Sequence, residues 1–300
     1  MNTIIKKILV PVDFTETSEA ATSKAIELAT LLSAELYLIH VIEDSLYYGA
    51  PFNIVPEGQP AISPSLQEIE GVVKEKMDSV RNEINNKYGI MAHTNITSGR
   101  VDTEIIDYAK SEHINLIVMG THGISGFSEV FVGSNAQRVV TLSEIPVLTM
   151  QTAINKGFKK ILIPIDNSLH SREKVNIAMK IAELFGSEIL VLGLADSHEK
   201  KEEDKFKIKL ESIEAILNSH NLKFTSTMEH GENLADVALN YAEKNNCDLI
   251  VINTGHESRT TGIFMGALAQ QIVNHSKTPV LSVRHTQSSF VISTPGSGAS

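Results

Sequence analysis

A glycine-rich segment in the first half of the chain has the residue types that bind phosphate groups. Gly120 and Gly123 are separated by two residues, and nine residues separate Gly123 from Gly133 and the adjoining Ser134. Glycines let backbone N–H groups approach an anion without a Cβ in the way, and a helix that begins there adds the partial positive charge of its N-terminus. The Ser134 hydroxyl can donate to a phosphate oxygen. The same residues also fit a plain turn with Ser134 as N-cap, so the spacing alone leaves both interpretations open.

Short apolar runs alternate with amphipathic segments around these glycines. In the first half we expect strands at 8–12, 36–41, 93–97, 116–119 and 147–150, and helices at 18–32, 65–88, 103–112 and 135–143. Runs such as 8–10 contain no polar residue, which indicates burial on both faces and therefore a parallel sheet. A β-α-β-α order with right-handed crossovers predicts a doubly wound, Rossmann-like α/β fold. Ligands of such folds bind beyond the carboxyl ends of the strands.

The second half of the chain repeats the first. Six of the eight residues at 6–13 return unchanged at 159–166, an offset of 153, whereas later landmarks such as 116–119 return at an offset of 133. The first half therefore carries 20 extra residues, which we place in the proline-rich loop 45–64. The repeat predicts two domains, at 1–152 and 153–285, each with a mainly parallel five-stranded sheet. Residues 286–300, rich in Ser, Gly, Thr and Pro, are expected to form a flexible tail.

The glycine-rich segment is degenerate in the second half. The positions of Gly120, Gly123, Gly133 and Ser134 are taken, in the same order, by Asn253, His256, Gly266 and Ala267. An imidazole fills space that a phosphate needs, and alanine lacks a hydroxyl that could donate to it. We therefore expect the second half not to bind phosphate in the same way.

The charge of the chain disfavours nucleic acid as a partner. The formal net charge is −10, and residues 1–150 hold 10 Lys and Arg against 19 Asp and Glu, while residues 151–300 hold 16 against 17. An acidic surface repels a polyanion. A phosphate ligand in the first half must therefore be held by backbone dipoles or a metal ion.

Cysteine usage and hydropathy indicate a cytoplasmic protein. Cys247 is the single cysteine, which excludes an intramolecular disulfide and a multi-cysteine metal site. The sequence has no run of the roughly 18 to 20 apolar residues that span a bilayer, and its N-terminus lacks the features of a signal peptide. We therefore expect no membrane partner.

Familiar catalytic motifs are absent from the sequence. There is no Walker-type Gly-x4-Gly-Lys-Ser/Thr run, no Gly-x-Ser-x-Gly elbow and no zinc-protease histidine pair. His40 and His122 could carry protons, but no partner carboxylate is fixed by spacing, so we favour plain hydrogen-bonding roles for both. No catalytic residue and no metal ligand is assigned.

The pattern Gly-x2-Gly-x9-Gly-Ser follows an opening strand that ends in Pro11-Val12-Asp13 and precedes Pro146-Val147-Leu148. This arrangement resembles the nucleotide-binding type of the universal stress protein family, and the resemblance covers both halves. It implies ATP, with or without magnesium, as the ligand of the first domain. The residues implied are Gly120, Gly123, Gly133 and Ser134 for the phosphates, Asn135 beside them, Asp13 beside the ribose and adenine, and backbone at Val41 for the base.

The resemblance also implies how the two domains pack and what the protein does. Single-domain members commonly dimerise through the final strand, so the apolar runs 146–150 and 279–283 are expected to meet as edge strands in a pseudo-dimer. A further homodimer is open. The implied function is that of a nucleotide-binding stress-response regulator and not a fast enzyme. The alternatives are an adaptor that needs no nucleotide and a slow ATP hydrolase, for which no base can be assigned.

Overall fold

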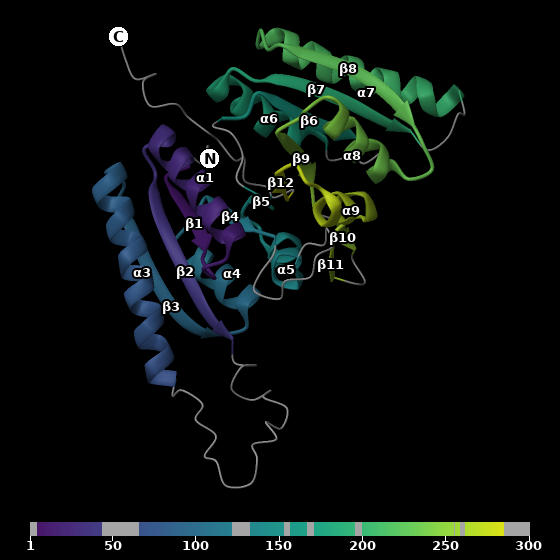
Figure 1. Cartoon of the computed structure of the whole chain (residues 1–300). Helices are drawn as coiled ribbons and strands as arrows, with labels where there is room; N and C mark the ends of the chain where they lie inside the picture. The colour runs from purple at the N-terminus through teal and green to yellow at the C-terminus, as the bar shows by residue number, and fades with distance from the viewer. Residues whose placement is uncertain are drawn as a thin grey trace, which may run out of the picture.

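The computed structural model describes residues 5–43, 66–121, 133–152, 157–166, 171–195, 200–254, 256–258 and 262–284. Figure 1 shows two α/β halves side by side. The elements of the first half are β1 (Lys7–Pro11), α1 (Glu16–Leu32), β2 (Glu35–Glu43), α3 (Leu66–Tyr88), β3 (Ala92–Gly99), α4 (Val101–Ser111), β4 (Leu116–Gly120), α5 (Ser134–Leu142) and β5 (Val147–Met150). Each expected strand and helix of this half is present within a few residues of its expected ends. The tail at 286–300 and the loop at 45–64 lie outside the described residues.

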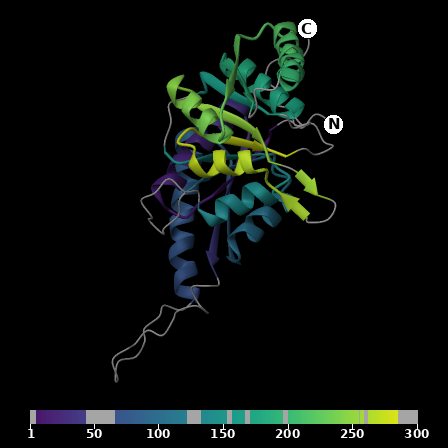
Figure 2. The same cartoon turned by 90° about the vertical axis from the view of Figure 1, so that its right-hand side faces the viewer.

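The second half repeats this order and adds one hairpin. Its elements are β6 (Lys160–Ile165), α6 (Ser171–Phe185), β7 (Glu188–Ala195), α7 (Lys200–Ser219), β8 (Phe224–His230), α8 (Leu234–Lys244), β9 (Leu249–Asn253), β10 (His256–Ser258), β11 (Gly262–Phe264), α9 (Ala267–His275) and β12 (Val280–Val283). The antiparallel pair β10 and β11 stands where the first half has its glycine-rich segment, and the sequence did not predict it. Strand β11 packs against α5 of the first half (Figure 2).

The two expected five-stranded sheets are joined into one sheet of ten strands. The strand order is β3-β2-β1-β4-β5-β12-β9-β6-β7-β8. Neighbouring strands are parallel within each half, and β5 meets β12 in antiparallel register, with Val280 opposite Thr149 and Leu281 opposite Leu148. The predicted pairing of the two edge strands is therefore confirmed.

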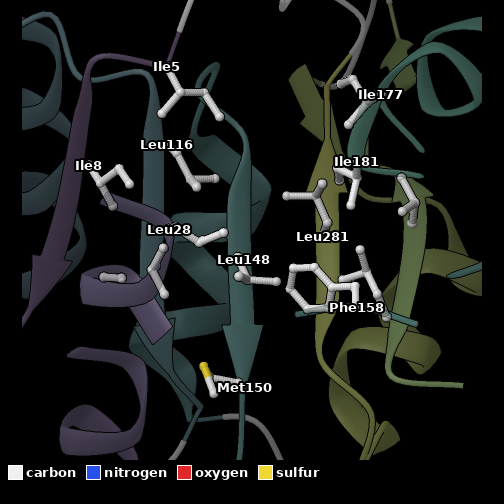
Figure 3. Packing of buried hydrophobic residues seen from close by; sticks show 14 of the residues in the cluster. Ile5, Ile8, Leu28, Leu116, Leu148, Met150, Phe158, Ile177, Ile181 and Leu281 are labelled. Carbon is white, nitrogen blue, oxygen red and sulfur yellow. The ribbon is translucent and has the colours of Figure 1, made fainter. Parts of the chain in front are cut away.

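Helices cover both faces of this sheet. Helices α1, α3, α6 and α7 pack on one face, and α4, α5, α8 and α9 pack on the other. On the first face the buried side chains of Leu148, Leu281 and Phe158 form one core that continues across the junction of the halves (Figure 3). Among the described residues, no helix is long and apolar enough to cross a membrane.

Candidate functional site

The predicted site residues gather at the carboxyl edge of β1, β2 and β4. Strand β1 pairs with β2 on one side and with β4 on the other, so the residues that follow these strands lie side by side. Asp13 follows β1, Val41 lies near the end of β2, and Gly120 ends β4. The start of α5 joins them through Gly133, whose N–H donates to the Thr121 carbonyl at 2.5 Å. Gly123 and His122 lie outside the described residues.

The N-terminus of α5 lies at this edge, next to Thr121 at the end of β4. Gly133 is the N-cap, with φ −56° and ψ 146°, and as a glycine it supplies no side-chain hydrogen bond to the first turn. Ser134 is the first residue of the helix and is exposed. The interpretation of Ser134 as the N-cap is therefore wrong. The first N–H groups of a helix have no partner within the helix, and together with the helix dipole they make such a terminus a place where an anion can be bound.

The backbone of Val41 points past the end of β1 at this edge. The carbonyl of Ile39 accepts from the Val12 N–H at 2.8 Å, so it points toward β1. Strands have a period of two, so the N–H and C=O of Val41 point the same way, past the end of β1 at Pro11. The strand thus presents a donor and an acceptor where a planar heterocycle could be held.

Asp13 makes an Asx turn at the start of α1. Its Oδ1 accepts from the Thr15 backbone N–H at 3.0 Å and from the Thr15 hydroxyl at 2.5 Å. Thr15 in turn caps α1 by accepting from the Ser18 N–H at 3.3 Å. Asp13 therefore holds the capping residue in place through this turn, while the N-cap of α1 is Thr15 itself. Oδ2 accepts no hydrogen bond from the part of the chain that the structure describes, which leaves one carboxylate oxygen for a ligand hydroxyl.

The side chain of His40, on β2, hydrogen-bonds to the backbone just after the end of β1. Its Nδ1 lies 2.6 Å from the Val12 carbonyl, which can only accept, so Nδ1 carries the proton. The ring lies 5.1 Å from that of Phe14, and the Lys76 ammonium lies 5.1 Å from the Phe14 ring centre. Burial lowers the pKa of His40, and Lys76 adds to this effect, while the Val12 bond and the Asp13 charge oppose it. These contacts give His40 the hydrogen-bonding role we favoured for it.

A carboxylate that sequence reasoning missed stands beside the start of α5. Asn135 donates through Nδ2 to Oε1 of Glu43 at 3.1 Å, which links α5 to the last residue of β2. Glu43 is two residues past Val41, so both share one face of the strand, a spacing that could have pointed to it. Its charge opposes an incoming phosphate. Within the described ranges no group of three or more metal-binding side chains occurs.

A Cβ at either of two glycines of the segment would approach neighbouring backbone, and the approach is closer at Gly120. A Cβ at Gly120 would lie 2.7 Å from the backbone carbon of Thr17, at the start of α1. A Cβ at Gly133 would lie 3.0 Å from the Thr121 carbonyl oxygen. Gly120 is therefore required for the seating of α1 on β4, whatever the ligand.

Gly120→Ala should lower the free energy of unfolding by about 1–3 kcal/mol, because the added methyl meets rigid backbone. Gly71→Ala is the matched control: nothing lies within 4 Å of its added Cβ, and it is an exposed position inside α3. There alanine should stabilise by about 0.5–1 kcal/mol. Urea denaturation measures both, and equal stability changes in the two variants would contradict the packing role of Gly120.

Known proteins similar to this chain agree with this fold. Residues 5–151 and 157–284 each match the family described as "Universal stress protein family". Universal stress protein MJ0531 of Methanocaldococcus jannaschii is 32% identical over 148 residues, which cover 49% of this chain and 83% of that protein. A universal stress protein of Mycolicibacterium smegmatis is 22% identical over 295 residues, which cover 92% of this chain and 96% of that protein.

A solved structure extends the similarity to both halves. The crystal structure of a universal stress protein from Archaeoglobus fulgidus DSM 4304 superposes with a TM-score of 0.73 at 20% identity, covering 95% of this chain and 98% of that one. At this identity the likeness shows the fold alone. The two family matches and the repeated fold together establish that the chain is a tandem, two-domain member of the universal stress protein family.

Proposed function

We propose that the first domain binds an adenine nucleotide, ATP above all, at the carboxyl edge of β1, β2 and β4. The observation that carries the proposal is that the N-terminus of α5, with a glycine as its N-cap, lies at the same edge of the sheet as the backbone of Val41. One end of this site suits a phosphate and the other suits a planar base. Membership of a family with a nucleotide-binding type supports the same ligand.

Each predicted residue then has a role that its position allows. The first turn of α5 and the Ser134 hydroxyl hold the phosphates, with Asn135 beside them. Oδ2 of Asp13 accepts from a ribose hydroxyl, and the Val41 backbone pairs with the edge of the adenine. Gly123 is assigned to the phosphates from the sequence pattern alone.

Nucleotide binding acts as a regulatory signal in this proposal. Phosphates at α5 compete with the Asn135–Glu43 bond, so the ligand changes the link between α5 and β2. Such a change can alter affinity for a partner in the cytoplasm during stress. The site offers no assigned base to activate water, and we therefore propose a regulator and not a rapid hydrolase.

The carboxylate of Glu43 should make binding depend on magnesium. Glu43→Gln removes the charge beside the phosphate position, so the affinity for metal-free ATP should rise about fivefold, near 1 kcal/mol. Glu144→Gln is the control, because it removes the same charge from an exposed residue past the far end of α5. Calorimetry in EDTA measures both variants. Unchanged metal-free affinity in Glu43→Gln would show that Glu43 does not face the phosphates.

The same method tests the location of the site. Gly133→Asp places a negative charge at the N-cap of α5, so ATP affinity should fall tenfold or more, about 1.4 kcal/mol. Gly266→Asp makes the same change at the N-cap of α9, where φ and ψ are −59° and 150°, and binding should persist. Aspartate is a good N-cap, so both variants should fold. Titration of the full chain should give about one site, and two equivalent sites would refute the assignment to the first domain alone.

A further inference from the structure

Two lysines converge on the carboxyl end of β6, the counterpart of β1 in the second domain. Asp166 follows β6 at the position that Asp13 holds in the repeat. The Lys174 ammonium donates to the Pro164 carbonyl at 2.6 Å and lies 4.0 Å from Oδ1 of Asp166. The Lys209 ammonium donates to the backbone carbonyl of Asp166 at 2.6 Å. Cationic groups therefore occupy the edge where the first domain is proposed to hold the ribose.

Lys174 is the residue that distinguishes the two domains here. At the repeat offset of 153 it corresponds to Ala21 of α1, whose side chain ends at Cβ. Lys174 extends from α6 and its side chain is only 4% exposed. By contrast, Lys209 has a counterpart in Lys76, at the offset of 133. The lysine on the long helix is thus common to both halves, whereas the buried ammonium beside the aspartate is peculiar to the second.

The buried position of Lys174 demands polar partners. An ammonium withdrawn from water is costly unless it is hydrogen-bonded and paired. Pro164 and Asp166 supply an acceptor and a negative charge. Burial is the largest effect on the group and lowers the pKa of Lys174 to about 8, while Asp166 opposes this and Lys209 adds to it. The ammonium of Lys174 is therefore buried, and groups of its own domain supply its hydrogen bond and its opposite charge.

We propose that Lys174 is an internal ligand of the second domain, which pairs with Asp166 where the first domain leaves Asp13 for a ribose. This proposal rests on the proposed nucleotide site of the first domain in one respect: that site identifies the ribose as the group that Lys174 replaces. In the second domain the ammonium of Lys174 then takes the place beside Asp166 that a nucleotide's ribose would need. This effect does not depend on the degenerate loop. Lys174 is then a second feature, besides the degenerate loop, that disfavours a nucleotide in the second domain.

Chemical rescue in the full-length chain tests this role. Lys174→Ala removes the part of the side chain that propylammonium matches in length and charge. Propylammonium chloride should raise the melting temperature of this variant saturably, by about 2 °C or more, relative to sodium chloride of equal ionic strength. Wild type and Lys174→Met, which fills the space without a charge, should not respond. No response in Lys174→Ala, or an equal response in all three proteins, would overturn the proposal.

A measurement on the wild type covers the case in which Lys174→Ala does not fold. Brief acetylation followed by peptide mapping should modify Lys174 at least tenfold more slowly than Lys180, which lies on the same helix and is more exposed. Equal rates would mean that Lys174 is not enclosed and would overturn the proposal. Neither experiment uses a nucleotide, so a failure here leaves the ATP site of the first domain standing, and loss of that site leaves these outcomes unchanged.

Discussion

The antiparallel pairing of β5 with β12 is the interaction on which the rest of the molecule depends. It joins the two halves into one ten-stranded sheet and lets a single apolar core, with Leu148 and Leu281 at its centre, continue between them. Because each half is parallel within itself, antiparallel pairing at the centre sends the two carboxyl edges to opposite ends of the sheet. The carboxyl edges of the two halves therefore lie far apart on one sheet. Side chains at one edge can differ from those at the other without disturbing it.

Much of this arrangement could be predicted from the sequence, since buried parallel strands appear as unbroken apolar runs and the repeat fixes where they recur. The edge strands were predictable because the apolar runs 146–150 and 279–283 each close a repeat, and an edge strand leaves one side unpaired within its own half. The contact between Glu43 and Asn135 was not predictable, since 92 residues separate them, although Asn135 was expected beside the phosphates and the spacing from Val41 could have pointed to Glu43. The hairpin β10–β11 was missed because strands of three residues show no period. Gly120 was predicted to contact the phosphates, yet the structure shows another reason for a glycine there: a Cβ at this position would clash with the backbone of α1.

The difference between the domains comes from a few side chains on a shared backbone. The N-caps of α5 and α9 have nearly the same dihedral angles, and both are glycines without a side-chain cap. Around them the first domain has alanine at 21 and serine at 134, and the second has Lys174 and Ala267. The aspartate after β1 thus has an alanine at the helix position where the aspartate after β6 has a buried ammonium. A repeated fold need not carry a repeated site.

The central claim is that the protein binds an adenine nucleotide, and the ligand it retains from the cell tests this most directly. Full-length protein would be purified rapidly with magnesium and no added nucleotide, then denatured, and the released small molecules quantified by mass spectrometry against protein concentration. We predict close to one adenine nucleotide per chain, and little or none from Gly133→Asp purified in parallel. A wild-type protein that releases none, and takes up none when incubated with ATP and magnesium, would contradict the account and favour an adaptor that acts without a nucleotide.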